Sequence, residues 1–142
     1  MTCLLWLTLL AADPAGFVIW NAADLKKTTS DGARFSSQSL GRFKGHYAML
    51  AHRQGNGGAE MHETETDIFV IETGSARLIV GGKIVHPKTT GLHEIRGSSI
   101  EGGLEKTLEA GDIVHIPAKT PHQLLVGSAA KFTYFVLKVQ AQ

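Results

Sequence analysis

Short apolar runs separated by glycine-rich turns dominate the middle and the end of the chain. The clearest runs are residues 67–73 (DIFVIET), 76–80 (ARLIV) and 131–139 (KFTYFVLKV). Each run is rich in β-branched and aromatic residues and too short for an ordinary helix, and no 3.6-residue period competes with the strand pattern. The pattern therefore predicts an all-β domain.

The first part of the chain has a more mixed pattern. Residues 17–20 are predicted to form a strand, and Asn21 followed by Asp24 is typical of the N-terminal cap of a brief helix over residues 22–27. A polar loop is predicted over residues 28–39, followed by a strand marked by Phe43, Tyr47 and Met49. A turn over residues 53–58 ends this strand.

Two glycine turns predict that the following strands form a meander. Gly74 and Ser75 separate two of the apolar runs, which is a hairpin pattern, and Gly81 with Gly82 makes the next turn. Glycines divide the insert over residues 83–110 into short pieces, for which we expect irregular loops and short strands. The sheet is completed by three further predicted strands, residues 111–116, 123–126 and 131–139.

Length and charge narrow the class of protein. The 142 residues suffice for one domain with a sizeable core and are too few for two domains of ordinary size. Fourteen Lys and Arg residues and 13 Asp and Glu residues are mixed along the chain and give a formal net charge of +1. No continuous basic surface is expected, so the charge pattern argues against nucleic acid as a partner.

The first twelve residues, MTCLLWLTLLAA, are apolar and too few to cross a bilayer as a helix. Small residues follow them, which predicts a secretory signal and processing region over residues 1–16 and a single folded domain over residues 17–142. No Lys or Arg precedes Lys26, so the alternatives are a buried first strand and a misplaced start codon. Under the signal hypothesis the protein is secreted or periplasmic, has no membrane contact after cleavage, and loses its one cysteine, Cys3.

Four candidate metal ligands lie in two short blocks, EMHETETDIFVIETG and GDIVHIPAKTPH. Glu60 and His62 have the same parity, so on a strand both side chains point to one face, and Asp67 follows five residues later. His122 ends the second block. Each residue alone would be a surface group or a turn histidine. Together they predict a site for one divalent transition metal ion, Mn, Fe, Zn or Ni, and the lack of sulfur ligands argues against Cu(I).

The first block resembles the first sequence motif of the cupin superfamily. That motif ends in an acid, six residues and a glycine, a spacing that Asp67 and Gly74 reproduce. Counting back from Asp67 places His62 and Glu60 on the two histidine positions of the family motif. The resemblance extends over residues 55–139.

The second block resembles the second cupin motif, which is a glycine, five residues, a proline and then a histidine. Gly111, Pro117 and His122 match it, whereas Lys119 stands where the family usually has glycine. The resemblance implies an all-β, double-stranded β-helix barrel of the cupin or jelly-roll kind, here with a short N-terminal helix.

Two departures from the family pattern concern the ligands themselves. Glu60 replaces a histidine, and Asp67 replaces a glutamate that is one methylene longer. Two carboxylates would formally neutralise a divalent ion and make it a weaker Lewis acid than a site with three histidines and one carboxylate. The shorter Asp67 side chain leaves open whether it reaches the ion or only supports another ligand.

Other polar residues are weaker candidates for substrate binding. Arg96 in the insert is a candidate clamp for a substrate carboxylate, with a surface pairing to Glu94 or Glu101 as the alternative. His46 and Tyr47 alternate on a predicted strand, so one of them faces the interior and is a candidate proton donor or an ordinary core residue.

The resemblance implies a metal-dependent enzyme that acts on a small polar organic molecule, in a pocket that the insert covers. Family members include dioxygenases, isomerases and lyases as well as proteins that only bind a ligand, and the fold does not choose among them. The alternative is therefore a non-catalytic cupin that binds a metal or a small ligand. We also expect a homodimer, formed through the apolar segment 17–20.

Overall fold

The computed structural model describes residues 13–27, 33–127 and 130–141 of the chain. The apolar run 1–12 of the predicted signal and residues 28–32 of the predicted loop lie outside the described residues. Nearly all regular structure in the described part is β-strand, as the sequence predicts. No helix in this part is long and apolar enough to cross a membrane.

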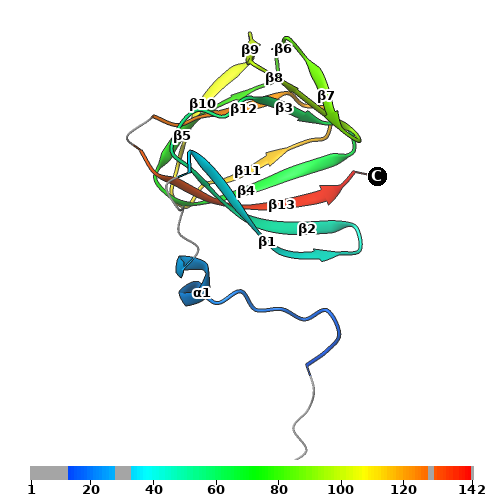
Figure 1. The fold of residues 1–142 in the computed structure, drawn as a ribbon, viewed down its shortest axis with the longest axis vertical. Helices are drawn as coiled ribbons and strands as arrows, with labels where there is room; N and C mark the ends of the chain where they lie inside the picture. The colour runs from blue at the N-terminus through cyan, green and yellow to red at the C-terminus, as the bar shows by residue number, and fades with distance from the viewer. Residues whose placement is uncertain (1–12, 28–32, 128–129, 142) are drawn as a thin grey trace, which may run out of the picture.

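Two antiparallel sheets face each other and form the walls of a barrel (Figure 1). The first has five strands, in the order β1 (Phe35–Phe43), β2 (His46–Arg53), β13 (Phe132–Gln140), β4 (Glu65–Thr73) and β11 (Ile113–Ile116). The second has six strands, in the order β10 (Leu104–Glu109), β5 (Ser75–Val80), β12 (His122–Leu125), β3 (Ala59–His62), β8 (Glu94–Gly97) and β7 (Lys88–Gly91). A small separate pair is formed by β6 (Lys83–Val85) and β9 (Ser99–Glu101).

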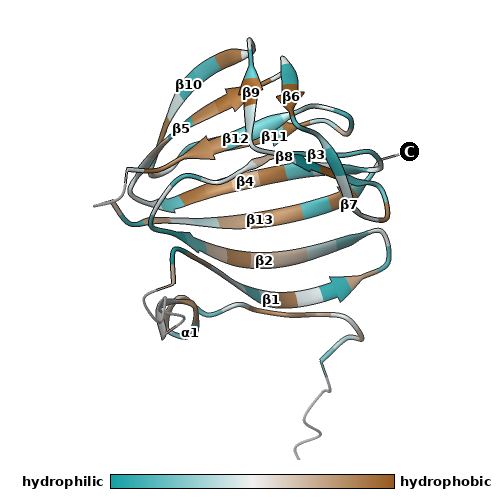
Figure 2. Ribbon diagram, turned by 45° about the horizontal axis from the view of Figure 1, so that its top comes forward, coloured by the Kyte–Doolittle hydropathy of each residue, from teal (hydrophilic) through white to brown (hydrophobic). Residues whose placement is uncertain are grey.

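The core lies between the two sheets and is built from alternate residues of their strands. On β4, Asp67, Phe69 and Ile71 are buried whereas their neighbours are half-buried or exposed, because successive side chains of a strand point to opposite faces. The aromatic side chains of the core, Phe69, Phe132 and Tyr134, come from β4 and β13. Figure 2 shows β4 and β13 mainly brown along their middle, with teal patches toward the end where β13 finishes. At that end the buried polar residues His62, Asp67 and His122 meet.

The predicted hairpin at Gly74 is wrong. β4 belongs to the five-stranded sheet and β5 to the six-stranded sheet, so the chain crosses between the sheets at this glycine. Gly74 has a φ of +81°, and a Cβ atom there would lie 2.1 Å from the carbonyl oxygen of Lys131. A close crossing of two backbones, and not a two-residue turn within one sheet, therefore requires this glycine. The predicted meander fails for the same reason, because β3, β4 and β5 alternate between the two sheets.

The predicted short helix is confirmed as α1 (Ala22–Lys27), whereas the predicted strand before it is wrong. Residues 17–20 form no strand, and Phe17 and Ile19 are exposed. Trp20 packs against the outer side of the barrel, where its Nε1 donates a hydrogen bond to the carbonyl oxygen of Leu40 at 3.1 Å. The segment lacks a partner strand among the described residues, so its apolar pattern does not produce a strand.

The predicted loop 28–39 is wrong in its second half. Residues 35–39 are the first part of β1, which pairs with β2 along its whole length, with an irregularity between Ser39 and Gly41. The sequence FSSQSLGRF is too polar to signal a strand by itself. It becomes one because β2 offers an unpaired edge, which shows tertiary context prevailing over local propensity.

The insert 83–110 is more regular than expected. The short strands predicted there are present as β6 to β10, and three of these, β7, β8 and β10, lie in the six-stranded sheet. β8 pairs directly with β3, which carries Glu60 and His62. The insert therefore forms part of the wall beside the candidate ligands.

Candidate metal centre

Strand pairing brings three of the four predicted ligands together on one sheet. Glu60 and His62 lie on β3 with the same parity, and His122, the first residue of β12, is the direct register partner of Glu60. Strand β11 ends at Ile116, directly before Pro117, as predicted, and the following turn leads into His122. Asp67 comes from β4 in the opposite sheet. The candidate centre therefore lies between the two sheets.

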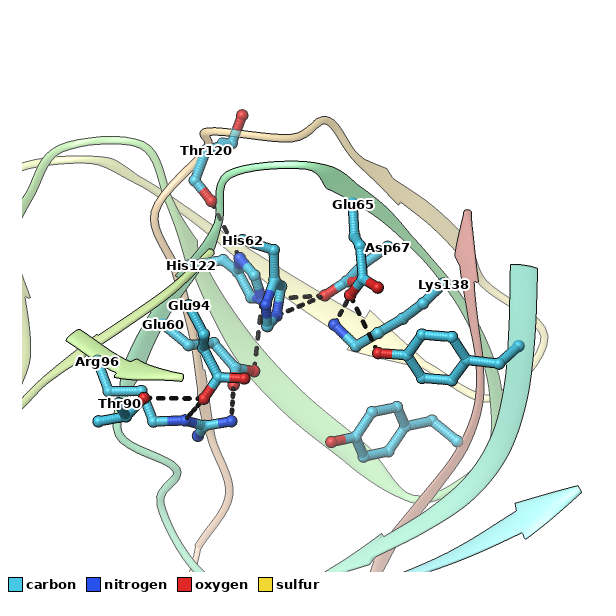
Figure 3. Close-up of polar contacts among 12 residues, drawn as sticks. Glu60, His62, Glu65, Asp67, Thr90, Glu94, Arg96, Thr120, His122 and Lys138 are labelled. Atoms are coloured by element: carbon cyan, nitrogen blue, oxygen red, sulfur yellow. Dashed lines mark hydrogen bonds and ion pairs between the residues drawn. The ribbon is translucent and has the colours of Figure 1, made fainter. Parts of the chain in front are cut away.

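The side chains of these residues converge (Figure 3). Nε2 of His122 lies 3.4 Å from Oε1 of Glu60 and 3.3 Å from Oδ2 of Asp67. Nε2 of His62 lies 3.5 Å from the same oxygen of Asp67. One donor atom from each of Glu60, His62 and His122 falls within 4.8 Å of the other two, which is close enough for the three to share one ion.

The two histidines present nitrogen atoms that the protein itself does not satisfy. Nε2 of His62 and Nε2 of His122 are both buried and have no hydrogen-bond partner in the described structure. Nδ1 of His122 lies 3.0 Å from the carbonyl oxygen of Thr120, so it must be the protonated nitrogen. The lone pair of the neutral ring is then on Nε2 and points toward the carboxylates. Buried polar atoms are rarely left without a partner, and this arrangement fits a divalent metal ion.

The close packing of carboxylates and imidazoles shifts the pKa values of both. Burial raises the pKa of Glu60, but contact with His122 and the charges of His122, Arg96 and His62 outweigh burial and bring the pKa to about 2. Burial lowers the pKa of His122, but the carboxylates of Asp67 and Glu60 raise it to about 9. Without a metal ion, a proton on His122 therefore takes the place of the positive charge that the carboxylates attract.

The pKa of His62 is lowered, first by burial and then by the charge of Lys138. Burial raises the pKa of Asp67, but His122 and Lys138 lower it by more. The two histidines therefore differ: His62 favours the neutral form that binds metal, whereas His122 must release a proton to do so.

Two basic side chains offset the two carboxylates, and one of them was missed by sequence reasoning. Nη2 of Arg96 lies 2.9 Å from Oε2 of Glu60, its direct register partner. Nζ of Lys138 lies 2.5 Å from Oδ1 of Asp67, also its direct register partner. The sequence predicted that the two carboxylates neutralise a divalent ion, but it counted only the ligands. Because Arg96 and Lys138 already offset the charges of the two carboxylates, the charge of the ion would not be neutralised. The parity that Lys138 shares with the apolar inward residues of β13 was a signal that could have identified it.

The weaker candidates occupy different places. Arg96 is half-exposed and, besides Glu60, makes a close ion pair with Glu94. Tyr47 is the inward member of its pair: it neighbours Lys138 across the sheet, and its hydroxyl donates a hydrogen bond to Oε2 of Glu65 at 3.0 Å. Burial and this contact with Glu65 raise the pKa of Tyr47, so the phenol stays protonated. His46 faces the other way and stacks on Phe43, with ring centroids 4.9 Å apart.

No protein-family model matches the chain, and no curated protein matches it in sequence. Solved structures do match in shape. A conserved protein with a double-stranded β-helix domain from Klebsiella pneumoniae is 14% identical, with a TM-score of 0.61 over 87% of this chain and 90% of that one. A cupin-2 domain protein from Shewanella frigidimarina is 12% identical, with a TM-score of 0.59 over 86% and 95%.

A third match is the DMSP lyase DddQ from Ruegeria pomeroyi, which is 20% identical, with a TM-score of 0.54 over 75% of this chain and 47% of that one. At these identities the similarity concerns the fold. The chain has the double-stranded β-helix fold of the cupins, and the fold that the two sequence motifs imply is confirmed.

Proposed function

We propose that the protein binds one divalent transition metal ion through Glu60, His62 and His122, with Asp67 as a fourth donor, and acts with it on a small polar organic molecule. The observation that carries the proposal is the pair of buried Nε2 atoms without hydrogen-bond partners, both facing carboxylate oxygens. The mixed nitrogen and oxygen donors suit Mn, Fe, Zn or Ni.

The surrounding residues have defined parts in this proposal. The carbonyl of Thr120 fixes the tautomer of His122, so that Nε2 is the nitrogen offered to the ion. Arg96 and Lys138 each hold one carboxylate and offset its charge. A bound ion would supply a Lewis acid that polarises an oxygen of the substrate. Because each carboxylate already has a basic partner, the charge of the ion would be reduced less than the ligands alone suggest.

The reaction class is an oxidation with dioxygen, an isomerisation or a lyase reaction. Similarity to a DMSP lyase supports lyase chemistry on this fold and nothing narrower. The test begins with elemental analysis of the purified full chain. Mn, Fe, Zn and Ni forms are then screened against small hydroxy acids, keto acids, sugars and phenols, with turnover and dioxygen consumption as readouts. Turnover by one metal form and not by metal-free protein is the expected result.

A second candidate is a protein that binds metal and a small ligand without chemistry. The position of Asp67 favours this binding function, because a fourth protein donor leaves fewer coordination positions on the ion free for a substrate. The same screen separates the two. If no form turns over a compound or consumes dioxygen, while one compound raises the melting temperature by mass action, the enzyme proposal fails and the binding proposal stands.

A further inference from the structure

Lys138 brings a positive charge into the interior of the barrel beside the candidate metal centre. It lies on β13 between two register partners, Asp67 on β4 and Tyr47 on β2. Its side chain is only 11% exposed. Oδ1 of Asp67 faces Lys138, and Oδ2 of the same carboxylate faces Nε2 of both histidines. A single carboxylate therefore separates the ammonium group from the place of the ion.

The ammonium group of Lys138 has hydrogen-bonding capacity that the protein does not use. A lysine ammonium carries three N–H donors and no acceptor. Within the part of the chain that the structure describes, its one acceptor is Oδ1 of Asp67. Glu65, the next inward carboxylate on β4, instead accepts the hydroxyl of Tyr47. Two donors of a nearly buried cation thus remain for a ligand, and an unpaired donor in such a place is unfavourable.

Arg96, the other basic residue at the centre, differs in this respect. Its Nη2 contacts Glu60 and its Nε contacts Glu94, while about half of its side chain is exposed to solvent. Its charge is shared between two carboxylates and screened by water. Lys138 has one carboxylate and little water, so an anion gains more from contact with Lys138.

We propose that Lys138 is a substrate-binding residue and that the substrate of the metal centre is a small carboxylate. In this arrangement a carboxylate oxygen of the substrate accepts hydrogen bonds from Nζ of Lys138 while the substrate is held at the centre formed by Glu60, His62 and His122. The proposal rests on the proposed metal site. It narrows the substrate from small polar molecules to small organic acids, and it assigns to Lys138 the part that the sequence suggested for Arg96.

The test uses the full chain loaded with Co(II), whose visible absorption changes when a ligand enters the coordination sphere. Oxalate is the anionic probe and imidazole the neutral one. Replacing Lys138 by Met keeps most of the side-chain volume and removes the charge. Because a hydrogen bond to a charged group contributes roughly 1.5–3 kcal/mol, the Kd for oxalate is expected to rise by about 10- to 150-fold in Lys138→Met. The Kd for imidazole is expected to stay within about twofold of that of the unaltered protein.

Two control variants make the result specific. Lys83→Met removes an exposed lysine on β6, and Arg96→Met removes the other cation of the centre. Lys83→Met is expected to change the Kd for oxalate by less than about threefold, and Arg96→Met, which takes the partner from Glu60, is expected to raise it by less than Lys138→Met does. Lys138→Met alone could fold poorly because Asp67 loses its partner. In that case the Kd for oxalate is compared between Asp67→Asn and the double variant Asp67→Asn with Lys138→Met, since the charge of Asp67 is absent from both.

The outcomes separate this proposal from the metal proposal. Failure of the unaltered protein to bind Co(II) overturns both. Binding of Co(II) without binding of oxalate overturns the carboxylate proposal alone. The carboxylate proposal is also overturned if oxalate binds the unaltered protein and Lys138→Met equally well. It is overturned as well if Arg96→Met raises the Kd for oxalate as much as Lys138→Met does. A loss of affinity for oxalate but not for imidazole in Lys138→Met supports the proposal.

Discussion

The backbone amide of Lys119 donates a hydrogen bond to the carbonyl oxygen of His62 at 2.7 Å. This bond ties the turn before β12 to the end of β3 and so fixes the spacing of His62 and His122. Lys119 adopts a φ of +63° to make it, a left-handed conformation that favours glycine. The position is the one at which the cupin motif usually has glycine, a residue that adopts such a φ without strain.

Replacing Lys119 by glycine is expected to stabilise the protein. The strain of a left-handed non-glycine residue is released, and the greater entropy of glycine in the unfolded chain offsets part of the gain, leaving about 0.5–1 kcal/mol. Thermal unfolding should show a melting temperature higher by roughly 2–5 °C. Lys106→Gly on the exposed face of β10 is the control and should destabilise by a similar amount. A lower melting temperature in Lys119→Gly would contradict the assignment of strain.

The metal-free protein should lose stability at alkaline pH. The pKa of His122 is about 9 in the folded protein and 6.5 ordinarily, so the unfolded chain releases this proton first. The stabilisation is complete below about pH 6.5 and is lost as the pH rises through about 9. Urea unfolding of chelator-treated protein between pH 6 and 9.5 measures the free energy of unfolding. In the control variant His122→Gln, this contribution to its pH dependence should be absent. Stability that stays constant or rises over this range in the unaltered protein would refute the charge state assigned to His122.

Asp67 and Lys138 should be strongly coupled in stability. Asp67→Asn leaves a nearly buried ammonium group without its carboxylate and is expected to cost about 2–4 kcal/mol in metal-free protein. Adding Lys138→Met to Asp67→Asn should recover part of that loss, because both charges are then absent. A double-mutant cycle by chemical denaturation should give a coupling energy of at least about 1 kcal/mol. Additive effects would indicate that the two side chains do not form a pair in solution.

The segment before α1 should mediate assembly. Phe17 and Ile19 are 55% and 65% exposed, and β1 ends the five-stranded sheet with β2 as its one partner in the described structure. Exposed apolar side chains beside an open strand edge favour association, and we expect a homodimer in which this segment contacts the partner chain. Light scattering at high micromolar concentration should give a dimer mass for the unaltered protein and a monomer mass for Phe17→Ser with Ile19→Ser. A monomeric unaltered protein would count against it.

Local apolar patterns predicted the all-β fold class, and the resemblance to the two cupin motifs predicted the convergence of the four candidate ligands. Equal parity places Glu60 and His62 on one face of a strand, and the motif spacing brings His122 to the same end of the barrel. Strand pairing was not predictable in the same way. Gly74 gives the same signal in a hairpin and in a crossing between sheets, and only the backbone approach at Lys131 distinguishes them.

The basic partners of the carboxylates could not be derived from ligand spacing. Arg96 and Lys138 are 36 and 71 positions from Glu60 and Asp67, and each meets its carboxylate only through strand register. β1 was missed for a related reason, because a serine-rich segment becomes a strand only where β2 offers an edge. Pairings between distant strands therefore account for what the sequence alone left open.

Metal content is the most direct test of the central claim. The unaltered chain, purified without added chelator, is predicted to contain about one equivalent of a divalent transition metal by elemental analysis. A variant with both His62→Gln and His122→Gln should contain almost none while retaining the all-β circular dichroism spectrum, and His115→Gln, on an exposed strand position, should retain the full amount. Stoichiometric metal in the double variant, or none in the unaltered protein reconstituted with Mn, Fe, Zn and Ni in turn, would contradict the account.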